Sequence, residues 1–547
     1  MTRAIQHSMI ILLALILAGA VSLVSCGDNK PIVLKRNVVS VALVHPPNVT
    51  NLMRQFKVLF EESPAATLAE GSKVELNLIA DSSMSAATKI SSGKNKVHGS
   101  LAPSFSVVNL ANSKRSNLGP QQVNCAQLFA TPIVLAATTK KISSMGLNTN
   151  EFSWREVFNL GENSDVLNAL PVFNQTSPLA SDSGLAAIIQ FLYIATEFPT
   201  AIKREDLDIP ATINKLRAAQ SKVSSYAFFD KTLLNQLTSA RTNKLEFSIT
   251  TEQDIALFNQ ERMKIGKEGV TALYPKEGSV WLDYNLCMSD ADWLTPAHKK
   301  SLEQLIEYLK QPALQQMAVG TGLRPAAGAV PLTPPLTPQF KVDINKGSQA
   351  MLPVSGDVIE RLTLLWPDLL KPSAISFVLD TSGSMEGTSL RLGKTHFRNT
   401  IASTQTRDTK SLISAASNVI VQKEFTNDGG LVIPVLDQLR AQGGSSIYDA
   451  ILKAVTLVQN PALDNYRRTI IVFTDGGDKN SNTPLSRLVE LVRESASRVN
   501  INLIIVGVGR DEPFDDMRQI AEAANGLFIE AQYDDLDGIF ARIRSII

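Results

Sequence analysis

The stretch that decides the fold of this chain is AISFVLDTSGSM, residues 374–385. Its first six residues form an apolar run of strand length, and a polar, serine-rich loop follows at once. A continuous apolar run is typical of a strand that is buried on both faces of a parallel sheet. In such a sheet, ligands bind at the carboxyl ends of the strands. The stretch therefore predicts an α/β domain with a binding loop directly after its first central strand.

Two further apolar runs of this kind follow in the C-terminal third, at Thr469–Phe473 and Ile501–Val508. Amphipathic helical patterns separate and follow these runs, at Ile447–Val458, Leu488–Val499 and Leu536–Ile547. Buried strands that alternate with helices indicate a doubly wound, mostly parallel sheet. We expect this domain to occupy residues 373–547.

The loop after the first strand carries three oxygen-bearing side chains, Asp380, Ser382 and Ser384. Their spacing allows a tight turn at Gly383 to bring all three oxygens to one point. Hard cations such as Mg²⁺ prefer oxygen ligands and keep some of their waters. One carboxylate with two hydroxyls leaves a divalent cation under-neutralised, so it seeks a further carboxylate. The alternative for such a loop, taken alone, is an ordinary turn or helix cap with solvated serines.

Two more polar loops fit the same edge of the predicted sheet. Residues 443–446 (GGSS) precede a helix, and residues 474–478 (TDGGD) follow the second buried strand. They add Ser445 and Asp475 as candidate ligands, with Ser446 as the alternative to Ser445 and with Asp478 assigned to the loop rather than to a metal. Three oxygen loops in these contexts favour a metal site over separate turns.

The three loops resemble the metal-ion-dependent adhesion site of the von Willebrand factor A domain. The Asp-x-Ser-x-Ser and Thr-Asp-Gly segments match the family, whereas a serine stands at residue 445, where the family usually has threonine. The resemblance implies a bound Mg²⁺, or another divalent cation such as Ca²⁺ or Mn²⁺, and a protein partner that offers an Asp or Glu to the metal. The implied ligands are Asp380, Ser382, Ser384, Ser445 and Asp475.

The chain begins with the features of an export signal. Arg3 and His7 form a basic start, an apolar run follows over Met9–Val24, and the sequence LVSC ends at Cys26. LVSC resembles a bacterial lipobox, which implies a lipid on Cys26 and an extracytoplasmic, membrane-anchored protein in the periplasm or at the cell surface. A cleaved signal with an incidental cysteine and an uncleaved anchor helix are the alternatives. We assign residues 1–26 to the signal and 27–36 to a tether.

The region between the tether and the metal-binding domain divides at a proline-rich stretch. Residues 37–326 alternate strand-like and helical patterns, which fits two α/β lobes. Residues 327–372 contain the prolines 331, 334, 335 and 338, which favour an extended linker, and a helix is expected at Asp357–Leu365.

Several short polar segments lie where strands give way to helices, at Asp81–Ser85, Ala102–Ser104, Asn174–Pro178 and Ser181–Gly184. Each one alone is best explained by helix capping. Together they resemble the two-lobed, extracellular solute-binding proteins of ABC transporters, which implies a cleft that takes a small solute. The residues implied as solute contacts are Ser82, Ser83, Ser104, Thr176, Ser177 and Ser183.

The remaining cysteines, Cys125 and Cys287, can pair outside the cytoplasm or stay as two small buried side chains. The solute-binding resemblance implies that two strands cross between the lobes, at Phe129–Ala137 and Trp281–Cys287. Such crossings would bring the two cysteines close together.

Composition and motifs argue against several classes of function. A net charge of +1 gives no reason to expect nucleic-acid binding. The five histidines show no metal-ligand spacing, and the chain has no nucleophile elbow and no phosphate-binding loop. We therefore expect a binding protein and not an enzyme. A solute receptor of an ABC-type transport system is the main alternative, and a hydrolase is the third.

Overall fold

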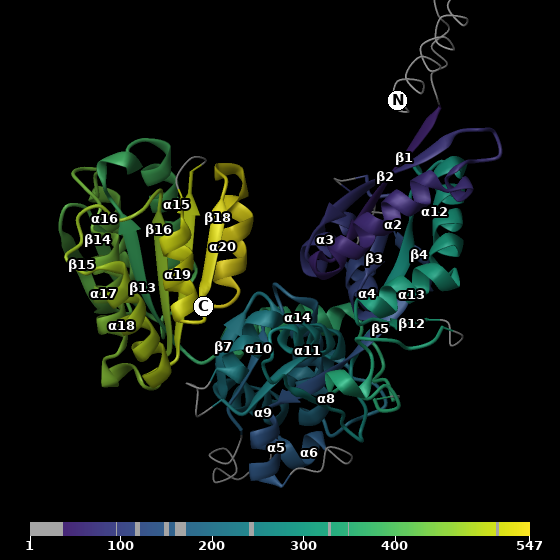
Figure 1. Cartoon of the computed structure of the whole chain (residues 1–547), viewed down its shortest axis with the longest axis horizontal. Coiled ribbons are helices and arrows are strands. Elements are labelled where there is room, and N and C mark those ends of the chain that lie inside the picture. The colour runs from purple at the N-terminus through teal and green to yellow at the C-terminus, as the bar shows by residue number, and fades with distance from the viewer. Residues whose placement is uncertain are drawn as a thin grey trace, which may run out of the picture.

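The computed structural model describes residues 37–93, 96–114, 121–146, 153–158, 171–239, 245–326, 330–347, 349–509 and 513–547. The expected signal, Cys26 and the tether lie outside the described residues. In the described ranges, none of the helices has the length and apolar character needed to span a bilayer. The strands form three separate sheets, and each sheet is the centre of one α/β body (Figure 1).

The first body, lobe 1, is built on a sheet with strand order β2-β1-β3-β11-β4. Strand β1 runs parallel to β2 and β3, while β11 is antiparallel to β3 and β4. The strands are β1 (Val38–His45), β2 (Lys73–Ala80), β3 (Gly99–Ala102), β4 (Gln121–Gln127) and β11 (Asn285–Asp290). The main helices are α2 (Thr50–Glu62), α3 (Ser83–Ser91), α4 (Phe105–Ser113) and α12 (Pro296–Leu309).

The second body, lobe 2, has the strand order β10-β5-β8-β6-β7, and β9 and β12 also pair with β5. Its central helix α8 is buried along almost its whole length because apolar residues occupy every face of it. The strands are β5 (Phe129–Ala137), β6 (Phe173–Thr176), β7 (Val223–Ala227), β8 (Phe247–Thr251), β9 (Thr271–Leu273), β10 (Trp281–Leu282) and β12 (Arg324–Pro325). The helices are α5 (Thr139–Met145), α6 (Trp154–Val157), α8 (Asp182–Ala195), α9 (Pro210–Ser221), α10 (Asp230–Thr238) and α11 (Glu252–Lys264). Helix α13 (Pro312–Gly320) contacts α2 and α12 of lobe 1 and leads into β12.

Two of the passages of the chain between the lobes run along pairs of strands, in agreement with the expected crossings. It leaves lobe 1 from β4 into β5 and returns from β10 into β11. Strands β4 and β11 are antiparallel neighbours, and a disulfide joins Cys125 of β4 to Cys287 of β11. The disulfide therefore ties the outgoing and returning strands together on the side of lobe 1.

The proline-rich segment is not a free extended linker. Four apolar side chains among and beside its prolines are buried, and three of them, Val330, Leu336 and Val342, belong to a cluster with lobe 2; the fourth is Phe340. The hydrophobic gain from burying them holds the segment on that surface, even though its prolines exclude regular helix and sheet.

Helix α14 (Gly356–Leu369) follows this segment and bridges the two lobes. It lies against α4 of lobe 1 and α9 of lobe 2. Gly356 is pressed so closely on α4 that a Cβ atom would lie 2.1 Å from the Ser113 hydroxyl oxygen. On the lobe 2 side, Arg361 pairs with Asp208 at 2.8 Å and Trp366 meets the Tyr226 ring edge-on. The helix then leads directly into the third body.

The third body, the C-terminal domain, has a sheet of order β15-β14-β13-β16-β17-β18. Neighbouring strands are parallel except for the edge pair β14 and β15. The strands are β13 (Ser373–Asp380), β14 (Thr409–Ala415), β15 (Val419–Thr426), β16 (Arg467–Thr474), β17 (Ile501–Val508) and β18 (Leu527–Ala531). The helices are α15 (Thr388–Ser403), α16 (Ile433–Gln438), α17 (Ile447–Val458), α18 (Leu485–Arg498), α19 (Asp515–Ala523) and α20 (Leu536–Arg544).

Helices cover both faces of this sheet, which confirms the doubly wound α/β fold. Helices α17, α18 and α19 bury their apolar sides in one cluster with the sheet, and α15 and α20 pack on the other face. The apolar cluster on the face covered by α15 and α20 continues into lobe 2 through Trp366, Leu370 and Ile546. The C-terminal domain is therefore packed against lobe 2 and does not hang on a free tether.

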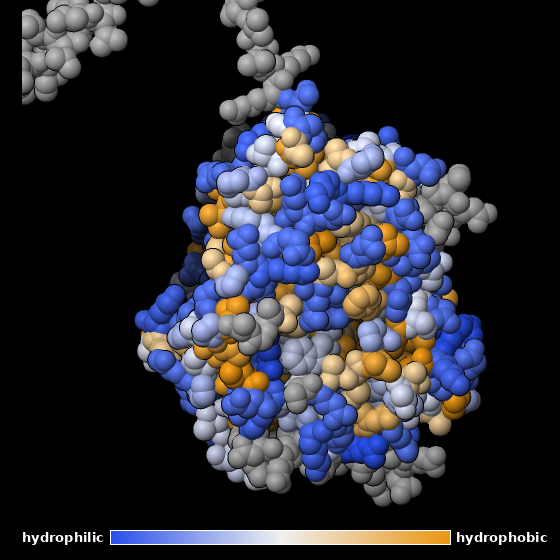
Figure 2. Space-filling view, turned by 90° about the vertical axis from the view of Figure 1, so that its right-hand side faces the viewer, coloured by the Kyte–Doolittle hydropathy of each residue, from blue (hydrophilic) through white to orange (hydrophobic). Residues whose placement is uncertain are grey.

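The surface on the right-hand side of Figure 1, seen face-on in Figure 2, mixes hydrophilic residues with smaller hydrophobic groups. Such a mixture is normal for a surface in contact with water.

Candidate functional site

The carboxylate of Asp380 lies at the carboxyl end of β13 and is only 1% exposed. Its Oδ1 accepts a hydrogen bond from the backbone N–H of Ser382 at 2.8 Å. Its Oδ2 accepts from the Thr474 hydroxyl at 2.6 Å and from the Ser445 hydroxyl at 3.3 Å. The parallel register of β13 and β16 brings their carboxyl ends, and hence Asp380 and Thr474, to the same edge of the sheet.

The other candidate ligands continue the cluster toward solvent. The hydroxyl oxygens of Ser382 and Ser384 lie 3.1 Å apart, and the Ser384 hydroxyl donates to Asp475 Oδ1 at 2.9 Å. Ser382 is buried, whereas Ser384 is exposed and Asp475 is half-buried. The structure thus brings all five candidate side chains into one hydrogen-bonded cluster that opens to solvent on the side of Ser384.

The electrostatics of the cluster suit a cation. Burial raises the pKa of the Asp380 carboxyl, and hydrogen bonds from Thr474, Ser382 and Ser445 act in the opposite direction. Within the described residues, no group of three or more His, Cys, Asp or Glu side chains could hold a metal ion. A cation at this cluster would therefore rely on two carboxylates, on hydroxyls and on water, which is the ligand chemistry of Mg²⁺ and similar hard ions.

Backbone contacts between the loops keep the cluster in place. The N–H of Gly383 donates to the carbonyl of Gly443 at 2.9 Å, and the N–H of Gln442 donates to the carbonyl of Thr381 at 2.8 Å. Gly443 adopts a positive φ of 68°, and a Cβ atom there would lie 2.4 Å from the Ser417 hydroxyl oxygen. A glycine is therefore required at this position.

Thr474 was not identified from the sequence as part of the Asp380 cluster. The buried Thr474 holds Asp380 and also accepts a hydrogen bond from the N–H of Gly476, so it orients the carboxylate. A hydroxyl residue at the last position of the second buried strand was the available signal. Ser446, the alternative to Ser445, donates to the carbonyl of Ser417 instead. Asp478 accepts from Ser481 and from the N–H of Tyr448, as a loop carboxylate does.

The sequence model of the von Willebrand factor type A domain matches residues 374–542, which include all of these loops. Residues 374–542 form a von Willebrand factor type A domain. Inter-alpha-trypsin inhibitor heavy chain H4 from Sus scrofa is 27% identical to the chain over 174 residues, which are 30% of this chain and 19% of that protein. Heavy chain H2 from Homo sapiens is 26% identical over 176 residues, or 18% of its length. The chain therefore matches about a fifth of the length of these curated relatives.

Solved structures resemble the A domain and the N-terminal region separately. A von Willebrand factor type A structure from Catenulispora acidiphila covers 32% of this chain and 42% of its own, at 19% identity and a TM-score of 0.29. The periplasmic binding protein AfuA from Actinobacillus pleuropneumoniae, with fructose-6-phosphate bound, covers 61% of this chain and 99% of its own. Its identity is 15% and its TM-score is 0.42.

A large cavity of about 1230 Å³, here called the interlobe cavity, lies between the two lobes. Asp81 and Ser82 line it from lobe 1, and Ser183 and Asp230 line it from lobe 2. The A domain supplies a third wall, because Ile539, Arg542 and other residues of α20 also face the cavity. Residues of all three bodies therefore line the cavity.

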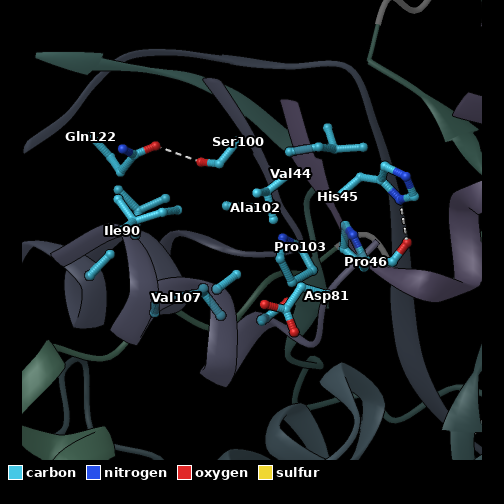
Figure 3. Close-up of a pocket in the computed structure, with 16 residues that line it drawn as sticks. Val44, His45, Pro46, Asp81, Ile90, Ser100, Ala102, Pro103, Val107 and Gln122 are labelled. Carbon is cyan, nitrogen blue, oxygen red and sulfur yellow. Dashed lines mark hydrogen bonds between the residues drawn. The ribbon is translucent and has the colours of Figure 1, made fainter. Parts of the chain in front are cut away.

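Only part of the expected solute contacts line this cavity. Ser82 and Ser183 do, while Ser104 faces a much smaller hollow beside Asp182. Ser83 lines a small, mostly apolar cavity inside lobe 1, which Figure 3 shows with Asp81 and Pro103 at one end and the Ser100–Gln122 hydrogen bond at the other. Thr176 and Ser177 are fully buried and are not among the residues that line the interlobe cavity.

The hydroxyls of lobe 2 have partners within the protein. Thr176 and Ser183 are hydrogen-bonded to each other at 2.8 Å, and Ser183 donates to Asp230 at 2.7 Å. Ser177 donates to the carbonyl of Ser545, in the C-terminal domain just after the A-domain residues, at 2.8 Å. The C-terminal domain therefore holds Ser177, which lies just before the cavity-lining residues Leu179–Ser183.

Carboxylates on the cavity wall were not singled out from the sequence. Burial raises the pKa of Asp182 to about 6, and the neighbouring Asp230 adds to the shift. Burial also raises the pKa of Asp230 and of Asp254, which lies close to Asp230. The signal available in the sequence was an Asp at the start of a helix after a strand, at residues 182 and 230.

Replacing Asp182 with Asn is expected to stabilise the protein at neutral pH. The folded-state pKa of Asp182 is about 6, and it is about 3.9 in an unfolded chain. The wild type therefore loses stability as the pH rises from 4 through 6. Asp182→Asn should raise the unfolding free energy by about 1–3 kcal/mol at pH 7.5 and leave it unchanged at pH 4. Urea denaturation at both pH values measures this, with the exposed Asp290→Asn as a control. A variant that is equally or less stable at pH 7.5 would contradict the assignment.

Proposed function

We propose that this chain is a membrane-anchored, extracytoplasmic binding protein that docks a protein partner through a metal ion on its A domain. The observation that carries the proposal is the Asp380 cluster. A buried carboxylate is joined there to serine hydroxyls and to Asp475, and the cluster opens to solvent at Ser384. The export signal and the lipobox-like sequence LVSC at residues 23–26 support the location.

In this proposal Asp380, Ser382, Ser384, Ser445 and Asp475 hold the metal, directly or through water. Thr474 keeps the Asp380 carboxylate in position. Mg²⁺ is the proposed ion because all the donors are oxygens. When bound, the ion supplies a positive charge with a free position that a partner's Asp or Glu can take. No catalytic group is needed for this role.

Partner capture tests the docking role. The full chain, immobilised, should retain an envelope protein in Mg²⁺ and release it in EDTA. The Asp380→Ala variant should retain nothing in either buffer. The same protein retained equally by wild type and variant, or in EDTA, would contradict metal-dependent docking.

The serine at position 445 offers a finer test of the ligand set. Ser445→Ala should weaken Mg²⁺ binding by about tenfold, because one oxygen ligand is replaced by water. Ser445→Thr should keep the wild-type affinity, since it restores a hydroxyl. Ser446→Ala is the matched control, because its hydroxyl faces Ser417. Isothermal titration measures all three, and loss of binding in Ser446→Ala with none in Ser445→Ala would reverse the assignment.

The interlobe cavity supports a second role, the binding of a small solute by the N-terminal region. Its size is sufficient for a small molecule. In this form the chain would be a solute receptor, and a transport role would require a permease partner. Mass spectrometry of molecules released from the purified full chain tests the solute role. If the protein releases no small molecule and binds none after refolding, the solute role is wrong and the docking role alone remains.

A further inference from the structure

A second cavity, of about 90 Å³, lies at the junction between the A domain, α14 and lobe 2. We call it the junction cavity. Its charged lining residues are Lys371, Arg407, Asp408, Arg467 and Arg544. They come from the end of α14, from the loop after α15, from the start of β16 and from α20. The cavity also contacts lobe 2 at Leu179.

The charges around the junction cavity do not balance. Four cationic side chains face one carboxylate, Asp408, and that carboxylate already accepts hydrogen bonds from the N–H groups of Ser373 and Gln405 at 2.8 Å. Among the ion pairs of the described residues, none includes Lys371, Arg407, Arg467 or Arg544. Arg467 is buried and the other three cations are partly buried, so this excess of positive charge around one carboxylate favours an anion.

Arg467 is the most buried of the four, at 8% exposure. Its Nε donates to the carbonyl of Lys371 at 3.0 Å, and its Nη1 donates to the carbonyl of Ile546 at 2.7 Å. Its guanidinium also lies over the Tyr226 ring at 5.1 Å. These neutral partners satisfy N–H groups without cancelling the charge. Burial lowers the pKa of Arg467, and burial followed by the charges of Arg468 and Arg467 lowers the pKa of Lys371.

The size of the cavity limits what can enter it. One water needs about 10–15 Å³ of such volume, so a cavity of about 90 Å³ has room for roughly six water-sized groups. A tetrahedral oxyanion has five non-hydrogen atoms and fits this space.

We propose that the junction cavity is a binding site for a small free oxyanion with the charge and size of phosphate or sulfate. Arg544, Arg407 and Lys371 would contact the anion, with Arg467 beneath it. Arginine suits this role because its planar guanidinium offers paired N–H donors to oxyanions. Since the cations come from separate elements, a bound anion would stabilise the packing of the A domain against α14 and lobe 2.

This site is independent of the proposed metal site. Arg467 is the first residue of β16 and Thr474 is the last, so the two sites lie at opposite ends of the strand, about 23 Å apart. Failure of the metal proposal therefore leaves the oxyanion proposal standing, and the reverse also holds.

Isothermal titration of sodium phosphate into the full chain tests the proposal, in EDTA and at constant ionic strength set with sodium chloride. We expect saturable binding and a melting temperature that rises with phosphate concentration. Arg544→Gln and Arg407→Gln should each weaken phosphate binding by about tenfold or more. Arg391→Gln is the matched control, because Arg391 is exposed on α15 about 18 Å along the helix from Ser403, which lines the cavity.

Several results would overturn the proposal. One is the absence of saturable binding of both phosphate and sulfate to the wild type. Another is an equal loss of affinity in Arg391→Gln, which would indicate a general effect of charge. Competition by phosphatidylglycerol vesicles would show a lipid headgroup in place of a free ion. Circular dichroism checks the fold of each variant, and Lys371→Gln replaces any variant that does not fold.

Discussion

Asp380→Ala is expected to abolish the binding of Mg²⁺ to the full chain. Asp380 is the buried carboxylate on which the Ser382, Ser445 and Thr474 hydrogen bonds converge. Without it, the cluster retains only hydroxyls and the half-buried Asp475, which cannot neutralise a divalent cation. Isothermal titration should show saturable Mg²⁺ binding to the wild type and a loss of at least about 100-fold in the variant.

The control for this experiment is Glu386→Ala. Glu386 is an exposed carboxylate two residues beyond Ser384, and its removal changes the net charge by the same amount. Its Mg²⁺ affinity should equal that of the wild type. An Asp380→Ala variant that binds Mg²⁺ as tightly as the wild type would show that the metal site is wrong. A similar loss in Glu386→Ala would show that net charge near the edge, and not a coordinated site, governs binding.

Removing the disulfide is the second change with a large expected effect. Cys125 and Cys287 are separated by 162 residues, and the strands they join are those through which the chain leaves and re-enters lobe 1. Opening so long a loop increases the entropy of the unfolded chain. The double variant Cys125→Ser, Cys287→Ser should therefore lose about 2–5 kcal/mol of unfolding free energy.

Urea denaturation, with and without dithiothreitol, measures this effect. The reductant should destabilise the wild type and leave the double variant unchanged. Lobe 1 should lose more protection from hydrogen exchange than the A domain, because Cys287 is buried in the sheet of lobe 1. A change below about 1 kcal/mol in the double variant would show that the strand pairing, and not the cross-link, holds the crossing together.

The sequence predicted strands β13, β16 and β17 of the A domain and missed β14, β15 and β18. The range Ile501–Val508 was predicted without error, because six of its eight residues are apolar and only Asn502 and Gly507 interrupt them. Strand β14 was missed because it begins Thr-Lys-Ser and lacks that pattern. Its Lys410 is only 2% exposed, and its ammonium group donates to the carbonyls of Gln405, Asp408 and Asn427. A buried lysine satisfied in this way cannot be distinguished from a surface lysine by its position in the sequence.

The sequence was also a poor guide to which residues line the interlobe cavity. Six hydroxyl residues were chosen because they precede or begin helices, yet Ser82 and Ser183 alone among them face the interlobe cavity. The carboxylates Asp81 and Asp230 line it as well. Which side of a loop faces the other lobe depends on how the lobes are oriented. Local pattern carries no information about that orientation.

By itself, the sequence determined the α/β fold of the A domain and the five residues of the candidate metal site. It could do so because Asp380, Ser382, Ser384 and Asp475 lie at the carboxyl ends of the parallel strands β13 and β16, which the sheet aligns, and Ser445 lies just before α17. Only the tertiary structure decided that Thr474 orients Asp380, that α20 forms a wall of the interlobe cavity and that four cations meet at the junction cavity. These features rest on contacts between distant segments, such as the hydrogen bond from Ser177 to Ser545, 368 residues apart. Such contacts arise from the packing of whole bodies, and hydrophobic burial drives that packing without regard to sequence distance.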